Sequence, residues 1–185
     1  MTVTSVSRTT VSEAPGPRTG TRVDEETVSV VLVACAGQQL GILSRHVEQV
    51  RPATQVTPLH GTPALIEGVV NVHGEVVPVL DGRRRIGISH SDVRLTDRFV
   101  IVRARGKRLV LHVEAAVGVV EVPAAELHEA AALQREAFGC KGISRLRGGL
   151  FVVHDIDALL SPHEFVRTEQ AVNATASARA GHAAS

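Results

Sequence analysis

The sequence predicts an all-β fold of eight to ten short strands with little helix, arranged as a barrel or a sandwich. Two observations lead to this prediction. Valine, leucine, isoleucine and alanine supply most of the apolar content, with four Phe, no Trp and no Tyr, and β-branched residues favour strands. The apolar segments are also short, because glycine, proline or charged residues interrupt them along the whole chain.

Length and charge limit what the protein can be. It has 185 residues and a formal net charge of +1, and this length suffices for one domain or two small packed lobes. The near-neutral charge gives no general attraction to nucleic acid or acidic lipid. Charged residues or glycines break every apolar run before the roughly 20 residues that a transmembrane helix requires. We therefore expect no nucleic-acid partner and no direct membrane insertion.

The two cysteines indicate a reducing compartment. Cys35 and Cys140 lie far apart, and neither belongs to a CxxC pair. Small reduced core residues are the preferred interpretation, and a disulfide between them is the alternative. The N-terminal residues lack the apolar region of a secretory signal. Both features favour a cytoplasmic protein.

The chain divides into three zones by composition. Residues 1–26 are rich in Ser and Thr and predict a disordered N-terminal extension. Residues 27–161 contain the apolar segments and predict the folded unit. Residues 162–185 are polar and rich in alanine, which predicts a loose C-terminal tail with at most a frayed helix.

The folded unit begins with short extended segments. The run TVSVVLVA (27–34) predicts a strand, and GQQLGI (37–42) predicts a turn followed by a second strand. HVEQVR (46–51) predicts a third, which Pro52 ends.

The segments GVVN (68–71) and EVVPVL (75–80) predict a pair of strands separated by the turn at 73–74. Pro78 inside the second strand belongs at an edge or a bulge, because it cannot donate a ladder hydrogen bond. Asp-Gly at 81–82 predicts a closing turn. These features are typical of a small, strongly bent barrel.

A hairpin is predicted next, with strands at 98–104 and 107–114 around the Arg-Gly turn at 105–106. Residues 109–114 alternate in a way that suits a half-buried strand. GGLFVVHDI (148–156) predicts the last strand, and Asp155 can cap the short helix that follows. A longer surface helix is predicted from composition over Ala124–Ala137.

The segment GVVNVHGEVVPVLDGR (68–83) resembles a motif of the CheW-like domain family, in which the order is Gly-Val-x-Asn-Leu-Arg-Gly-x-Val-Val-Pro-Val-Val-Asp-Leu-Arg. Asn71, Gly74, Pro78 and Asp81 occupy the matching positions. The segments TPALI, HVEQVRPATQVTPL and VVHDIDALLS are similar to other parts of the family pattern, in the right order. The resemblance covers roughly residues 27–161.

The resemblance implies a fold and a role. The fold would be two SH3-like five-stranded β-barrel lobes packed together. The role would be that of a non-catalytic adaptor in chemotaxis, without cofactor or metal, placed between the cytoplasmic tip of methyl-accepting chemoreceptors and the regulatory domain of a CheA-type histidine kinase. The residues implied in binding these partners are Val47, Gln49, Asn71, His73, Gly74 and Asp81.

The chain departs from the family pattern at several polar positions. The family's arginine falls on His73, its acid falls on Gln49, and Asp-Leu-Arg becomes Asp-Gly-Arg at 81–83. A histidine cannot offer a carboxylate the bidentate fork of arginine, so His73 is either a weaker receptor contact or an exposed turn residue without a role. The alternative function is a divergent scaffold of a non-motility signalling complex, or a competitor of a standard adaptor.

Other chemistry finds little support in the sequence. His154, Asp155 and Asp157 could suggest a metal site, but neighbouring strand residues point to opposite faces, which favours a helix cap. The arginine clusters at 83–85 and 103–108 fall at predicted turns, and stacking aromatics for nucleic acid are scarce. The preferred interpretation is that these arginines are solvent-exposed charges at turns. Binding of an acidic protein partner is the second interpretation. The cysteines lack a nearby activating triad. We expect no enzyme activity.

Overall fold

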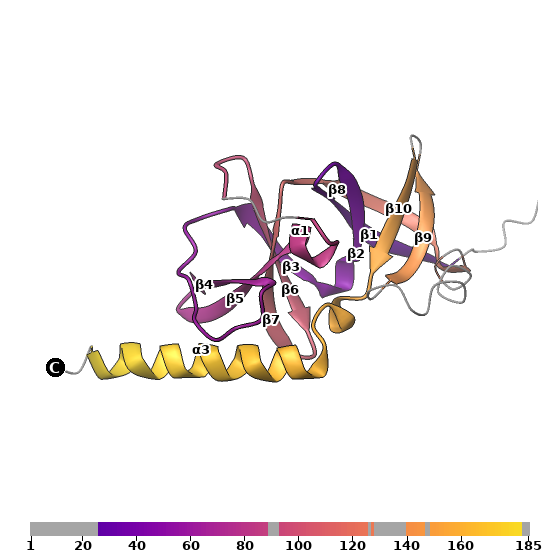
Figure 1. The fold of residues 1–185 in the computed structure, drawn as a ribbon. Coiled ribbons are helices and arrows are strands. Elements are labelled where there is room, and N and C mark those ends of the chain that lie inside the picture. The colour runs from indigo at the N-terminus through magenta and orange to yellow at the C-terminus, as the bar shows by residue number, and fades with distance from the viewer. Residues whose placement is uncertain (1–25, 89–92, 126, 128–139, 147–148, 183–185) are drawn as a thin grey trace, which may run out of the picture.

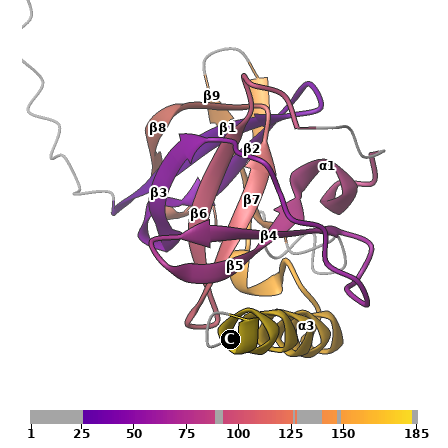
Figure 2. The same ribbon diagram turned by 90° about the vertical axis from the view of Figure 1, so that its left-hand side faces the viewer.

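The computed structural model describes residues 26–88, 93–125, 127, 140–146 and 149–182 (Figures 1 and 2). The N-terminal extension expected over 1–26 and most of the helix expected over 124–137 lie outside these residues. The described part holds ten strands in two five-stranded sheets, which confirms the predicted all-β class. Among the described residues, no helix is both long and apolar enough to span a membrane.

The first lobe joins the two ends of the folded unit in one sheet with the strand order β8-β1-β2-β10-β9. Its strands are β1 Thr27–Cys35, β2 Gln38–Leu43, β8 Ala115–Pro123, β9 Cys140–Leu146 and β10 Gly149–His154. The second lobe has the order β3-β6-β7-β5-β4. Its strands are β3 Val47–Pro52, β4 Ile66–Val72, β5 Glu75–Asp81, β6 Arg98–Ala104 and β7 Lys107–Val113. The short 3-10 helix η1, Ser44–His46, links the lobes.

The two lobes share one topology. Each contains two antiparallel hairpins joined by one parallel pair, β5 with β7 in the second lobe and β10 with β2 in the first. A fifth strand, β3 or β8, completes the opposite edge. The second lobe is consecutive in sequence, whereas the first is assembled from both ends. The lobes agree with the predicted SH3-like architecture as open rather than closed barrels, since no ladder joins the edge strands in the described residues.

Apolar residues form a core inside each lobe and a third between the lobes. Strand β7 separates the second lobe's own core from the central core, because Val110 packs into the former and Leu109 and Leu111 pack into the latter. Residues 109–113 are consequently all buried. The half-buried strand predicted from the alternation is wrong here, because the packed second lobe covers the face that a single sheet would leave in water.

Strand β5 is paired on both sides over only half its length. Pro78 lies opposite Val69 of β4, and the pairing with β7 begins one residue later, at Val79. The missing N–H of Pro78 therefore breaks no bond to β7, and the proline stands at a local edge, as its position in a strand predicted.

Short helices follow β5 and β10, one strand of each parallel pair. The turn predicted at 81–82 is instead the start of helix α1, Gly82–Arg85, because the buried Asp81 carboxylate accepts the backbone N–H groups of Arg83 and Arg84. After β10, Asp155 caps the 3-10 helix η2, Ile156–Ala158, as the sequence predicted.

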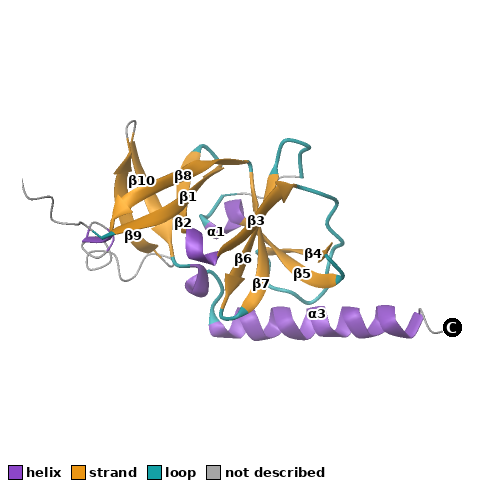
Figure 3. Ribbon diagram, turned by 180° about the vertical axis from the view of Figure 1, so that it is seen from behind, coloured by secondary structure: helices purple, strands orange, loops and turns teal. Residues whose placement is uncertain are grey.

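The last element is helix α3, Pro162–His182, which runs along the second lobe and extends past it (Figures 1 and 3). The composition of residues 162–185 predicts a loose tail with at most a frayed helix, whereas the structure has a 21-residue helix here. The helix begins with a capping box, in which the Glu164 N–H donates to Ser161 Oγ at 3.2 Å and the Ser161 N–H donates to the Glu164 carboxylate at 2.9 Å. Pro162 occupies the first helical position, where its missing N–H costs nothing.

Candidate functional site

Two of the residues implied in partner binding lie on the edge strand β3. Val47 is half-buried against the central core, and Gln49 is exposed. The pairing of β3 with β6 shifts between these two residues, so Glu48 stands in a bulge. Such a bulge redirects side chains at a sheet edge, and it leaves Glu48 facing the arginines of the neighbouring strands.

Three more lie in the turn between β4 and β5. Asn71 Oδ1 accepts the backbone N–H of Gly74 at 2.7 Å, which closes the turn. His73 and Gly74 both have positive φ, 51° and 90°, and both are exposed. Asn71 therefore shapes the turn, while His73 is the side chain that the turn presents to solvent.

Asp81 stands apart from this surface. Its side chain lies beneath α1, and the residue is 2% exposed. A partner cannot contact a carboxylate in this position directly. The structure gives Asp81 the task of holding α1 in place, where the family motif alone implied a binding residue.

One arginine connects β3 with the β4–β5 turn. Arg108 on β7 contacts the Glu48 carboxylate through Nε and the Glu75 carboxylate through Nη1, each at 2.7 Å. Arg103 also pairs with Glu48. The hydrogen bond from Arg108 lowers the pKa of Glu48 below its ordinary value, although burial opposes the shift. Arg108 thus connects the β3 edge with the turn. We use the name adaptor face for the residues at this place, Val47, Glu48, Gln49, His73, Gly74 and Glu75.

The arginine cluster at 83–85 is used inside the protein. Arg83 forms an ion pair with Glu114, and the Arg85 guanidinium donates to the Ala158 carbonyl at 3.3 Å. In the second cluster, the Arg105 backbone N–H donates to the Asp157 carboxylate at 2.6 Å. These three arginines therefore make contacts within the protein itself.

A buried ionic triad lies further along β7, at His112. His112 Nδ1 is 2.8 Å from Glu67 Oε1, and His112 Nε2 is 3.0 Å from Asp97 Oδ2. All three side chains are at most 6% exposed. Burial acts to lower the pKa of His112, but the two carboxylates outweigh it and hold the pKa above its ordinary value.

This triad is not among the sites that the sequence predicts. Its members are 45 and 15 residues apart along the chain, so no local motif marks them. The carboxylates contact different ring nitrogens and do not converge on a point. No group of three His, Cys, Asp or Glu side chains in the described residues is arranged to hold a metal ion.

The segment His154–Asp157 agrees with the predicted helix cap. The Asp155 carboxylate accepts the Asp157 backbone N–H at 3.1 Å, and the Asp157 carboxylate accepts a backbone N–H from the 105–106 turn. Burial lowers the pKa of His154, with a smaller contribution from Arg85. This segment therefore caps η2 and connects the end of β10 in the first lobe to the 105–106 turn of the second.

Cys35 is a free, buried thiol at the end of β1. Burial, reinforced by the nearby Glu114 carboxylate, raises its pKa to about 12, so the nucleophilic thiolate is scarce at neutral pH. We expect Cys35 in a Cys140→Ser variant to react with a thiol reagent at pH 8 only after denaturation. Rapid labelling of that variant in its folded state, measured by absorbance, would contradict this expectation. The same variant after denaturation supplies the control for full labelling.

Residues 29–164 match the CheW-like domain. The chain is 28% identical over 157 residues to the chemotaxis protein CheW of Klebsiella aerogenes, covering 80% of this chain and 92% of that one. It is 23% identical over 115 residues to the chemotaxis protein CheW of Thermotoga maritima, covering 62% and 76% respectively.

A solved structure has the same fold. The crystal structure of the scaffolding protein TtCheW from Thermoanaerobacter tengcongensis matches with a TM-score of 0.67 at 21% identity, covering 75% of this chain and 96% of that one. The family match ends at residue 164, near the start of α3. Most of that helix therefore lies beyond the shared domain. Because the match spans both lobes and well over half of the chain, this protein belongs to the CheW-like domain family.

Proposed function

We propose that this protein is a non-catalytic chemosensory adaptor that couples chemoreceptors to a CheA-type histidine kinase in the cytoplasm. Membership of the CheW-like family supports the scaffold role. The observation that carries the proposal is the contact of Arg108 with both Glu48 and Glu75, which joins the β3 edge and the β4–β5 turn. That contact connects the strand and the turn that carry the implied residues other than Asp81.

The mechanism needs no chemistry in the adaptor itself. Binding free energy at the adaptor face would fix the placement of the receptor tip, and a second surface would hold the kinase regulatory domain. A receptor that favours one of two placements would then shift the population of active kinase by its differential affinity for them. The three cores give the rigid body that such a placement requires.

The two polar departures weaken this surface in a testable way. Gln49 and His73 are both exposed, and neither supplies the full charge of the family residue at its position. We expect His73→Arg and Gln49→Glu each to tighten binding of a receptor-tip fragment from the same organism by about 10-fold, because a charge-assisted hydrogen bond contributes about 1.5 kcal/mol. Isothermal titration calorimetry measures the change.

A matched control is His163→Arg, which makes the same change at an exposed position on α3 and should leave receptor affinity unaltered. If neither His73→Arg nor Gln49→Glu changes the affinity of a receptor fragment that does bind, the partner uses another surface. If neither the receptor fragment nor the kinase regulatory domain binds at tens of micromolar concentration, the coupling role itself is wrong.

The same departures favour a second candidate, a divergent scaffold or a competitor of a standard adaptor. Such a protein would retain the kinase surface and bind receptors weakly. Adding it to a reconstituted array of receptor, kinase and standard adaptor would then lower kinase activity. Under the main proposal the protein would instead replace the standard adaptor in that array.

A further inference from the structure

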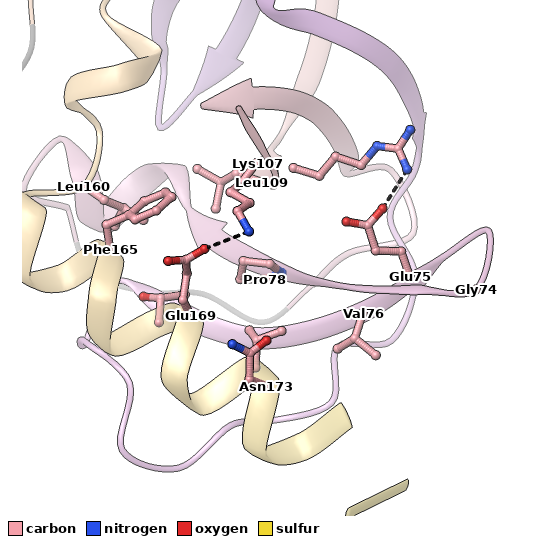
Figure 4. A pocket seen from close by; sticks show the side chains of 13 residues that line it. Gly74, Glu75, Val76, Pro78, Lys107, Leu109, Leu160, Phe165, Glu169 and Asn173 are labelled. Carbon is pink, nitrogen blue, oxygen red and sulfur yellow. Dashed lines mark hydrogen bonds and ion pairs between the residues drawn. The ribbon is translucent and has the colours of Figure 1, made fainter. Parts of the chain in front are cut away.

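Helix α3 closes a groove beside the adaptor face. The groove has a volume of about 320 Å³ and lies between α3 and the half of β5 that does not pair with β7. Val76, Pro78 and Leu109 line its floor, and Phe165 and Val172 line the helix side. Gly74 of the adaptor face lies at its edge (Figure 4).

The groove exists because two strands diverge. Strand β5 pairs with β7 from Val79 onward, whereas Glu75–Pro78 pair with β4 alone. The apolar side chains in this opening would face water without α3. The helix is thus the cover of an apolar strip that the shared domain leaves open, since the family match ends at residue 164.

The first turn of α3 is firmly attached. Phe165 packs against the central core, and the Arg105 guanidinium lies over its ring at 5.7 Å. Thr168 is 2% exposed, and its hydroxyl donates to the Glu164 carbonyl at 2.7 Å, so the residue is buried without an unsatisfied polar group. These contacts, together with the capping box, fix the point from which the helix extends.

Arg167 also donates to the Gly61 carbonyl at 2.8 Å, and the helix is held less closely from Glu169 onward. Glu169 pairs with Lys107 at 3.3 Å, and the two side chains are 39% and 67% exposed (Figure 4). Ion pairs in such positions contribute little to stability. The groove left beneath the helix also means that Val172 and the strand residues fill the space between them incompletely. Separation of this part of α3 from β5 therefore disrupts few tight contacts.

We propose that the groove is a binding site for an amphipathic helix of a partner protein, and that the part of α3 from Glu169 onward is a displaceable competitor that occupies it in the free protein. The seated helix defines the chemistry of the partner. Phe165, Thr168 and Val172 occupy positions i, i+3 and i+7 on one face, and Glu169 at i+4 meets Lys107. Phe165 and Thr168 stay in place as one wall of the groove, so the partner helix would present an apolar residue at the place of Val172 and an acid three residues before it, where Glu169 meets Lys107.

This inference rests on the proposed function, because the groove adjoins the adaptor face and would regulate access to it. Gly74 and Glu75 line the groove, and Arg108 joins Glu75 to Glu48. A partner helix in the groove would therefore also contact the adaptor face. Docked α3 would therefore lower the apparent affinity for a helical partner, and its release would raise that affinity.

The test uses two valine-to-aspartate variants of the full chain. Val172→Asp places a charge in the groove and leaves every residue of the strands intact. Val166→Asp makes the same change on α3 at a side where valine is 50% exposed, so intrinsic helix propensity changes equally in the two. Hydrogen exchange measured by mass spectrometry over residues 166–175 should become faster in Val172→Asp only, because an undocked helix is marginally stable.

The second measurement is independent of the chemosensory role. A fluorescent synthetic peptide of residues 162–182 serves as the helical probe. We expect it to bind the Val172→Asp protein at least about fivefold more tightly than the wild type or Val166→Asp. The same peptide carrying Val172→Asp should not bind. Equal binding of the unmodified peptide to all three proteins, or unchanged exchange in Val172→Asp, would overturn the inference.

A receptor-tip fragment from the same organism then separates this inference from the proposed function. Tighter binding to Val172→Asp than to wild type supports both. Equal binding to wild type and Val172→Asp overturns the competitor role of α3 and leaves the adaptor proposal in place. Failure to bind any of the three proteins contradicts receptor coupling, while the peptide measurement still decides whether the groove takes a helix.

Discussion

Replacing His112 with leucine is expected to lower the free energy of unfolding by about 3–5 kcal/mol, because the change removes the cation from a buried pair of carboxylates. Leucine fills much of the same space, so the loss would not come from a large cavity. Glu67 and Asp97 would remain at most 6% exposed on their side chains, facing each other's charge across an apolar side chain. Urea denaturation at pH 6 measures the loss.

The effect should depend on pH in a defined direction. The pKa of His112 in the folded protein lies above its ordinary value of 6.5, so folding favours the protonated ring. Its contribution to stability is then complete below about pH 6.5 and decreases as the pH rises through the raised pKa. The difference between wild type and His112→Leu should accordingly be larger at pH 6 than at pH 9.

His163→Leu supplies the control, since His163 is exposed on α3 and surface substitutions usually change stability by less than about 0.5 kcal/mol. Removing one partner of a buried ion pair usually costs about 3–5 kcal/mol. If the free energies of unfolding of His112→Leu and wild type differ by less than about 1 kcal/mol at pH 6, the triad does not hold the lobe together. A difference that grows toward pH 9 would instead show that the neutral ring is the stabilising form.

The strands could be predicted where local pattern and packing agree. The hairpin of β6 and β7 follows from two apolar runs and the Arg105-Gly106 turn, and both turn residues have positive φ, at 48° and 79°. In β8 the pattern is weaker, because Val117 and Val119 are 52% and 63% exposed. Val120 and Val122 pack against the first lobe's core, but the exposed valines beside them hide the alternation of a strand, so β8 is not among the predicted strands.

The helix α3 carries a local signal that composition obscured. Ser161-Pro162-His163-Glu164 has a capping residue, a proline at the first position and an acid three residues after the cap. The alanine-rich sequence that follows has few apolar residues, which predicted a tail. Docking of Phe165 and Thr168 against the second lobe depends on residues of distant strands, and no pattern inside 162–185 contains that information.

In the candidate site, too, local features could be predicted from the sequence, whereas contacts between distant strands could not. The β4–β5 turn follows from the motif, because Asn71 and Gly74 form its closing hydrogen bond. The role of Asp81 does not follow, since the motif cannot tell a buried cap from an exposed binding residue. The contact between Arg108 and the two glutamates joins three strands and could be found only in the fold. Binding by the adaptor face itself stays a prediction.

Gly68→Ala is expected to lower the free energy of unfolding by about 3–5 kcal/mol, because strain and a steric clash act together. Gly68 has a φ of +156°, and a Cβ atom placed there would lie 2.1 Å from the backbone oxygen of Thr57. That oxygen accepts the Val69 N–H at 2.8 Å, and the Thr57 N–H donates back to Val69 at 2.9 Å. A side chain at position 68 would separate Thr57 from Val69, break these two hydrogen bonds and distort the start of β4.

Gly74→Ala separates the two causes. Gly74 also has positive φ, at +90°, but nothing lies within 4 Å of the position its Cβ would take, so only the backbone strain of about 1–2 kcal/mol remains. Urea denaturation of both variants should therefore place Gly68→Ala well below Gly74→Ala in stability. Equal losses would mean that the chain near Thr57 moves aside at no cost. In that case the close approach of the 53–65 segment to β4 would not shape the barrel that positions His73.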